Sequence, residues 1–410
     1  MFKKLDAWWR DALVCGLCAA SLYAAPARPH TPLKQLLNSQ LEQRGFWHFF
    51  NLEYGPALRD FQELARRRPW DASVWNHITQ TLIYREMYRI GALETQLYSH
   101  GNPFLKTKLP PPSPAALKAI LSANRRAMLL ARQVLVHKPH DAFARYNEAV
   151  AWAQRGTYYF VLHKSYFEAL RDALRARHQA RLAEKYDPHF VDPRLILGVQ
   201  QFVAASLPWS VKLLAHFVGY SGSKKKGIAE IQDVIAHGEN ARTDARVLLV
   251  VIYRREGLNR QVLPILGWLQ QHYPRNVLFA VEQAEATEAA GLHEQARKEY
   301  HAILQRAAAH APGYENAPLD KVWYDLGGIN RLYSRWGAAL ADYRRSAQVS
   351  HAELRYRQAA ELAAGQMQDM LGNRSAALVA YKNCLALGES PAAKAAQHYL
   401  QHPYRRQHKS

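Results

Sequence analysis

Residues 323–343 read WYDLGGINRLYSRWGAALADY, and this stretch decides the fold. It combines the spacing W-x2-L-G with a later A-x3-Y, carried by Trp323, Leu326, Gly327, Ala339 and Tyr343. Two short antiparallel helices approach closely only where a small residue faces a large one. Gly and Ala placed at these distances from Tyr and Trp therefore predict a tightly crossed helical hairpin.

Four further segments carry parts of the same pattern in the same register. Their residues are Gly45, Ala57, Phe61 and Pro69; Tyr253, Gly257, Leu266 and Pro274; Gly291, Ala296, Tyr300 and Ile303; and Gly365, Gly372, Ala377 and Tyr381. One hairpin cannot bury its apolar face alone, whereas a stack of hairpins forms a continuous core and a curved groove. The repeated spacing predicts such a stack.

This spacing resembles the tetratricopeptide repeat family, most specifically over 246–381 and more loosely over 45–188. The resemblance implies an all-α, right-handed solenoid of helical hairpins whose concave groove binds other molecules. A solenoid can grow without splitting into separate cores, so 410 residues can form one array. The expected parts are 1–24, 31–98, 99–114, 115–240 and 241–410.

The first of these parts has the features of a secretory signal peptide. Lys3 and Lys4 precede a short apolar run that ends in the small residues Ala24 to Ala27, where cleavage is expected. The run is shorter than the roughly 20 apolar residues that a membrane span needs. The alternative is an amphipathic first helix that stays on a cytoplasmic protein.

Cysteine usage agrees with an ordinary packed core. Cys15 and Cys18 lie in the apolar run among residues that offer no polar support for a redox or metal site, and no small residue marks either for lipid attachment. A cleaved chain would keep only Cys384, so no internal disulfide is expected.

The 99–114 segment contains three consecutive prolines, which cannot continue a helix, and it is expected to be a loop inserted between repeats. An alternative is an extended peptide ligand for an aromatic groove.

The formal net charge of +20 favours anionic partners. Between residues 159 and 186 a helical projection places alanines on one side and a basic stripe on the other. The alanine side holds Tyr166, Ala169, Ala173, Ala176, Ala180 and Ala183, and the basic side holds Arg171, Arg175, His178 and Lys185. The stripe is either a solvated face or a contact for an anionic partner, and the same alternatives apply to Lys224, Lys225 and Lys226.

Residues 202–256 also show a more specific local resemblance, to the tetratricopeptide proteins of the inclusion-body-clearance and mitochondrial outer-membrane protein 39 type. It is carried by a Leu-Pro-Trp start and by glycines at 219, 222 and 227. It implies a scaffold associated with lipid droplets or membranes.

No motif of a known catalytic or metal site stands in the chain. The 219–227 segment fails the spacing of a phosphate-binding loop, and no HExxH, GxSxG or GxGxxG motif occurs. His398 and His402 are four residues apart, but no third ligand is near. We therefore expect no cofactor, no metal and no small-molecule substrate.

These observations predict a non-catalytic scaffold for protein interactions in the bacterial envelope. The groove is expected on the first helices of successive repeats, on or near which Arg254, Gln283, Trp323, Asp325 and Asn330 lie. The alternatives are binding of an acidic polymer or anionic membrane through the basic faces, and an unrecognised enzyme. Nucleic acid is not expected as the partner of an exported protein.

Overall fold

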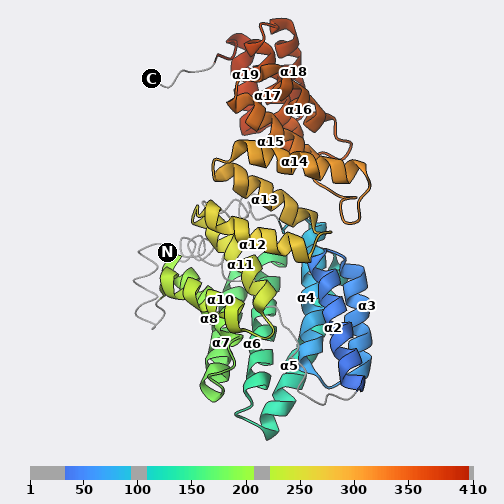
Figure 1. The fold of residues 1–410 in the computed structure, drawn as a ribbon, viewed down its shortest axis with the longest axis vertical. Coiled ribbons are helices and arrows are strands. Elements are labelled where there is room, and N and C mark those ends of the chain that lie inside the picture. The colour runs from blue at the N-terminus through green and yellow to red at the C-terminus, as the bar shows by residue number, and fades with distance from the viewer. Residues whose placement is uncertain (1–32, 94–108, 207–221, 406–410) are drawn as a thin grey trace. The chain divides into compact units, whose positions relative to one another are not determined.

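The computed structural model describes residues 33–93, 109–206 and 222–405 (Figure 1). The predicted signal peptide, the two N-terminal cysteines, most of the proline-rich loop and the Leu-Pro-Trp segment lie outside these residues. The described residues form helices, turns and no strand. The predicted all-α fold of tetratricopeptide-type helical hairpins is confirmed.

The chain forms two compact units, residues 1–274 and 275–410. The helices of unit 1 are α2 (Leu33–Phe50), α3 (Tyr54–Arg67), α4 (Ala72–Arg89), α5 (Pro114–His137), α6 (Ala142–Thr157), the π-helix η3 (Tyr158–Leu162), α7 (Tyr166–Tyr186), α8 (Pro193–Ser206), α10 (Lys224–His237), α11 (Arg242–Arg255) and α12 (Asn259–His272). Those of unit 2 are α13 (Val277–Ala289), α14 (His293–Ala308), α15 (Leu319–Leu332), α16 (Trp336–Gln348), α17 (Leu354–Met370), α18 (Arg374–Ala386) and α19 (Pro391–Gln401).

Side-chain caps fix where several helices begin. The Asp71 carboxylate accepts a hydrogen bond from the backbone N–H of Ser73 at the start of α4, and Asp141 does the same for Ala144 at the start of α6. Such caps satisfy donors that the first turn of a helix leaves unpaired. Within the described residues, no helix is long and apolar enough to cross a membrane.

The last helices of unit 1 lie against its first ones. Helices α11 and α12 belong to unit 1 because they pack against its first helices. Gln80 on α4 donates to Asp244 on α11 over 3.3 Å, and the rings of Phe50 and Tyr273 lie 5.0 Å apart. Val247 on α11 also packs against the N-terminal core. These contacts span some 160 to 220 positions of sequence, so local spacing could not show them.

Candidate functional site

The predicted small-large pairs meet at three hairpin crossings. A Cβ atom added to Gly45, Gly327 or Gly365 would lie 2.6, 2.7 or 2.4 Å from a ring carbon of Phe61, Tyr343 or Tyr381, respectively. Since real Cβ atoms essentially never come this close to another atom, only glycine permits these crossings. Each aromatic residue stands sixteen positions after its glycine.

Small residues also precede each aromatic residue by four positions. Ala57, Ala296, Ala339 and Ala377 are completely buried, as are Phe61, Tyr300 and Tyr381, and Tyr343 is nearly so. Ala and an aromatic ring four apart share one helix face, so both face the first helix of the hairpin. In the α13–α14 hairpin the position sixteen before Tyr300 is Ala284, also buried.

Three glycines that were grouped with these pairs have a different role. Gly257, Gly291 and Gly372 have φ values of 72°, 82° and 78° and lie in the turn between two helices, with open space around a Cβ. The same turn position is Leu52 and Ser334 in two other hairpins, with φ values of 63° and 58°. Glycine at this turn therefore serves backbone conformation rather than close packing.

The other repeat residues divide between core and turn. Tyr253, Leu266, Ile303 and Leu326 are buried. Pro69 and Pro274 are exposed and follow the ends of α3 and α12, where they cannot extend the helix. Trp323 is half-buried beneath the guanidinium of Arg345, which lies 4.6 Å from the ring centroid.

The predicted alanine and basic sides of α7 lie where the projection placed them. Ala169, Ala176, Ala180 and Ala183 are completely buried, while Arg171, Arg175, His178 and Lys185 are exposed. Arg175, however, turns toward α6, where its guanidinium lies 4.5 Å from the Trp152 ring centroid. Arg155 covers the same ring at 4.3 Å and binds the buried Asp172 through two hydrogen bonds. Arg175 is thus engaged within the fold.

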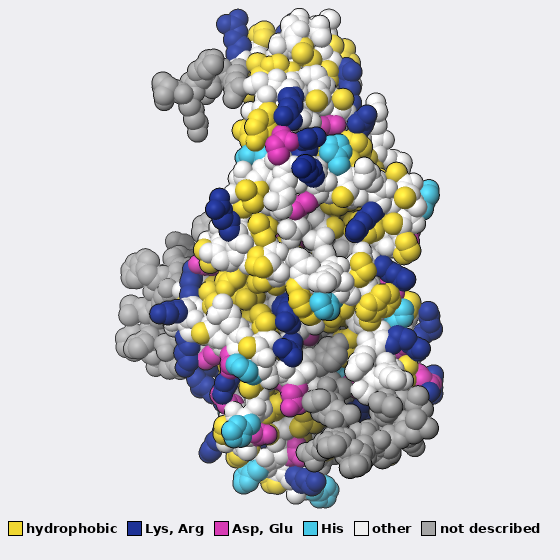
Figure 2. All heavy atoms as spheres, viewed as in Figure 1, with side chains coloured by type: hydrophobic (Ala, Val, Ile, Leu, Met, Phe, Trp, Pro, Cys, Tyr) yellow, Lys and Arg dark blue, Asp and Glu magenta, His cyan; other side chains and the backbone are white. Residues whose placement is uncertain are grey.

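Two of the three lysines at 224–226 are also paired. Lys224 donates to both carboxylate oxygens of Glu256 at 2.7 Å, and Lys226 lies 3.8 Å from Glu230. Lys225 is exposed. On the face drawn in Figure 2, Lys and Arg side chains are scattered among hydrophobic ones rather than gathered in one area.

The residues expected near the groove lie on α11, α13 and α15, the first helices of three hairpins. Asn330 is buried and donates to Asp342 at 2.7 Å, which joins α15 to α16. Asp325 accepts from Lys321 at 3.2 Å and from the Tyr300 hydroxyl at 3.3 Å. Arg254 donates to Asn259 across a turn. These three side chains therefore hold hairpins together.

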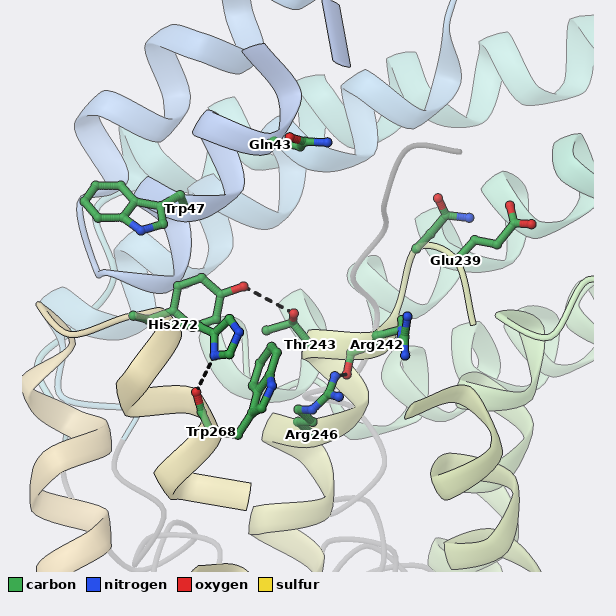
Figure 3. A pocket seen from close by; sticks show the side chains of 10 residues that line it. Gln43, Trp47, Glu239, Arg242, Thr243, Arg246, Trp268 and His272 are labelled. Atoms are coloured by element: carbon green, nitrogen blue, oxygen red, sulfur yellow. Dashed lines mark hydrogen bonds between the residues drawn. The ribbon is translucent and has the colours of Figure 1, made fainter. Parts of the chain in front are cut away.

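A hollow of about 490 Å³ lies in unit 1 at the edge of α2, α11 and α12 (Figure 3). Its lining residues are Gln43, Trp47, Glu239, Asn240, Arg242, Thr243, Arg246, Trp268, His272 and Tyr273. The volume falls within the usual range for ligand sites, about 300 to 1,000 Å³.

A column of three planar groups forms one wall of this hollow. The guanidinium of Arg246 lies 3.9 Å from the centroid of the Trp268 ring, and the rings of Trp268 and His272 stack at 3.8 Å. His272 Nδ1 donates to the carbonyl of Trp268 at 2.8 Å, which fixes its ring. The spacing of four residues between Trp268 and His272 places both on one face of α12.

A buried carboxylate fixes the turn that carries Glu239 and Asn240 to the lining of the hollow. Asp192, which is fully buried, accepts hydrogen bonds from the backbone N–H groups of Glu239, Asn240 and Ala241 at 3.2, 2.9 and 2.7 Å. These bonds fix the turn that leads into α11. Arg242 then donates to two carbonyls at the end of α10. The arginines thus project from a rigid base.

The electrostatics of the hollow favour an anion. Burial, together with the neighbouring Arg242, lowers the pKa of Arg246, so a negative group in the hollow would relieve the repulsion between the two cations. Burial raises the pKa of Tyr273, whose hydroxyl lies 3.3 Å from that of Thr243 and stays neutral. Glu239 is the one carboxylate of the lining. Cationic and flat aromatic surfaces suit a ligand that carries both a negative and an apolar group.

The described residues hold no group of three or more His, Cys, Asp or Glu side chains that could bind a metal. His398 and His402 are exposed at the C-terminal end of α19, with ring centroids 5.0 Å apart. Cys384 is buried, and burial raises the pKa of its thiol to about 11. That thiol is therefore neither exposed nor ionised at neutral pH.

No protein-family model and no curated protein matches the chain. Solved structures that are similar include human IFIT1 as a dimer with PPP-AAAA (14% identity, TM-score 0.37, covering 96% of this chain and 83% of that one). Yeast Tom70 has 11% identity and a TM-score of 0.36, covering 90% and 96% of the two chains. A tetratricopeptide repeat protein of Parabacteroides merdae has 10% identity and a TM-score of 0.29, covering 78% and 96%. These likenesses are too distant to carry an argument, and the assignment of a tetratricopeptide-like fold rests on the hairpins themselves. The resemblance of 202–256 to the outer-membrane protein 39 type gains no support from them.

Sequence spacing alone missed the hollow. No repeat position or motif described above includes Trp47, Trp268, Arg242, Arg246 or His272. The spacing of four residues shows that Arg242 and Arg246, and likewise Trp268 and His272, are neighbours on a helix. Their approach to α2 depends on contacts between residues far apart in the sequence.

Proposed function

We propose that this chain is a non-catalytic, tetratricopeptide-like scaffold that holds a segment of a partner protein at the unit 1 hollow. The observation that carries the proposal is the stack of Arg246 on Trp268 and His272 beside a second arginine. Arg and Trp are the residues that most often supply binding energy at protein interfaces. A partner segment with a carboxylate next to an aromatic or apolar side chain fits this lining.

Peptide selection tests this function directly. A displayed library of random peptides is selected on the full chain, and the affinities of synthetic versions are measured by fluorescence anisotropy. We expect the selected peptides to carry Asp, Glu or a free C-terminus beside an apolar residue. Arg246→Ala and Trp268→Ala should each weaken binding by about tenfold or more, as for residues at the centre of an interface.

Two control variants sharpen the measurement. Arg344→Ala removes an exposed arginine of unit 2 and should leave affinity unchanged. Arg246→Lys keeps the charge but loses the flat stacking surface, so an intermediate affinity is expected. Peptides that bind all variants equally would overturn the proposed site.

We further propose that the scaffold works in the bacterial cell envelope. Support comes from the basic start, the short apolar run and the small residues near Ala24 to Ala27. Mass spectrometry of the protein from its native host should find a mature terminus between Ala25 and Arg28. An intact Met1 in the cytoplasmic fraction would contradict export and would leave the proposed binding site unaffected.

A further inference from the structure

We propose that the outer face of α7 docks onto the surface of an anionic lipid membrane, independently of the hollow. The face is a stripe of six residues on the side of α7 opposite to the packed helices α6 and α8. They are Phe167, Arg171, Leu174, His178, Arg181 and Lys185, and all six are exposed. We call them the α7 stripe.

The geometry of α7 separates this stripe from the packed side. At about 100° per residue the six positions fall within about 80° of arc. The completely buried Ala169, Ala176, Ala180 and Ala183 fall on the opposite side, where α6 and α8 pack. Packing of this alanine face fixes the rotation of α7 about its own axis, and this sets the direction in which the stripe points.

Two large apolar side chains stand in the stripe without cover from the fold. Phe167 is 72% exposed and Leu174 is 45% exposed. They are seven residues apart, two turns along the same line of the helix. Isolated exposed apolar residues are ordinary, but an aromatic residue and a leucine on the same side of a helix as several basic residues match the pattern of helices that lie in a membrane interface.

No carboxylate of α7 lies within the stripe. Its carboxylates lie elsewhere: Glu168 accepts from Ser165, Asp172 is buried beneath Arg155, and Glu184 binds Arg194 at 2.9 Å. Arg171 lies 3.6 Å from Asp172 and is still 42% exposed. Long Arg and Lys side chains can extend their charged ends toward phosphate groups while their stems stay in apolar surroundings.

A lipid surface fits this stripe better than a soluble polyanion. A nucleic acid or acidic polysaccharide would engage the arginines and lysine but would leave Phe167 and Leu174 in water. Anionic lipid offers phosphates at the level of the cations and acyl chains below them, so both kinds of side chain find partners. The contribution of Phe167 and Leu174 to binding therefore distinguishes a lipid surface from a soluble polyanion.

Co-sedimentation of the full chain with vesicles tests the inference. The probes are vesicles of phosphatidylcholine alone and of phosphatidylcholine mixed with phosphatidylserine. We expect binding to the mixed vesicles. Phe167→Ala with Leu174→Ala should lower the partition coefficient about tenfold, from the loss of buried apolar area. A separate double variant, Arg181→Gln with Lys185→Gln, should lower the partition coefficient by about fivefold for each charge removed, which is a larger effect than that of the apolar pair.

Matched controls come from exposed positions of unit 2. Leu354→Ala with Val379→Ala removes apolar side chains of similar exposure, and Lys382→Gln with Lys394→Gln removes two exposed cations. Both controls should bind mixed vesicles like the unaltered chain. Circular dichroism melting of every variant should stay near that of the parent, because all the altered side chains are exposed.

Three results would overturn the inference. One is no binding of the full chain to mixed vesicles. Another is equal loss of binding in the control variants, which would indicate nonspecific attraction by net charge. The third is unchanged vesicle binding after removal of Phe167 and Leu174 together with full competition by soluble polyphosphate, which would assign the stripe to a polyanion.

Discussion

The two units of this molecule hold their hairpins together in different ways. In unit 2 the crossings use tyrosines whose hydroxyls return to the first helix: Tyr381 donates to Asp369 at 2.7 Å and Tyr300 to Glu288 at 3.1 Å. Each acceptor stands twelve positions before its tyrosine. In unit 1 the same place is taken by Phe61 and Leu266, which pack without a hydroxyl.

Buried amides also join neighbouring helices of unit 1, as Asn330 joins α15 to α16 in unit 2. Asn76 donates to the Asn147 carbonyl at 3.0 Å, Gln154 donates to the Asn76 carbonyl at 3.0 Å, and Asn124 donates to the Ala151 carbonyl at 2.8 Å. These bonds join α4, α5 and α6 in a way that no repeat spacing encodes. Unit 2 is therefore stabilised mainly by the same tyrosine crossing in successive hairpins. Unit 1 depends more on contacts that are specific to each pair of helices.

The comparison also bears on function. Both the hollow and the α7 stripe belong to unit 1, where the chain departs from the repeat and adds the π-helix η3 before α7. Departures of this kind are where a repeat scaffold gains individual binding features.

Removing the aromatic ring at a crossing should have the largest effect in both units. Phe61→Ala and Tyr381→Ala each leave a cavity beside a glycine and should cost about 3 to 5 kcal/mol of unfolding free energy. Chemical denaturation followed by circular dichroism measures the loss. Hydrogen exchange then shows which unit loses protection. A small effect of Phe61→Ala alone would mean that contacts other than this ring hold the first hairpin together.

Adjacent glycines of α15 provide an internal control for close packing. Gly327→Ala should cost about 1 to 3 kcal/mol, because its methyl group would lie 2.7 Å from the Tyr343 ring. Gly328→Ala meets no atom within 4 Å and should be neutral or stabilising by up to about 1 kcal/mol, because Ala favours the helix. Equal melting temperatures for the two variants would show that the crossing tolerates a larger residue.

The buried charges of unit 2 predict a pH dependence. Burial, with Glu285 and Glu288 nearby, raises the pKa of Asp325 to about 7, above its ordinary 3.8, despite the opposing effect of Lys321. Between about pH 4 and pH 7 the folded state keeps a proton on Asp325 that the unfolded state has released. The unfolding free energy should therefore fall as pH rises through that window. Calorimetry across this range should show the fall, and Asp325→Asn should flatten it. A stability that rises over the same window would contradict the assigned protonation.

Removing only the tyrosine hydroxyl should have the smallest effect. Tyr381→Phe loses the bond to Asp369, whose carboxylate keeps Arg374 and the backbone N–H of Tyr404 as partners. A cost of about 0.5 to 1.5 kcal/mol is expected from thermal unfolding. A cost as large as that of Tyr381→Ala would make the hydroxyl, and not the ring, the main stabilising feature of unit 2.

Unit 2 was largely predictable from sequence because its crossings depend on residues within one hairpin. The pairs of Gly327 with Tyr343 and of Gly365 with Tyr381 follow from spacing alone. Spacing could not separate these glycines from Gly372, since a crossing and a left-handed turn both select glycine.

The candidate site was hardly predictable, for a physical reason. Its walls come from α2 and from α11 and α12, and they meet because of contacts such as Phe50 with Tyr273. Helical projection did identify the exposed side of α7, because burial on one helix follows a local period. It did not distinguish Arg175, which turns to Trp152, from Arg171 and Lys185.

Site-specific photocross-linking tests the central claim, that partner binding is located at the unit 1 hollow, most directly. A photoreactive amino acid replaces Gln43, an exposed residue of the hollow, and in a second variant replaces Val379, an exposed residue of unit 2. After irradiation with a selected peptide, mass spectrometry counts the adducts at each position. The account predicts abundant adducts at 43, few at 379, and loss of those at 43 when Arg246→Ala is added. Adducts that form mainly at 379, or that persist at 43 in the Arg246→Ala variant, would contradict it.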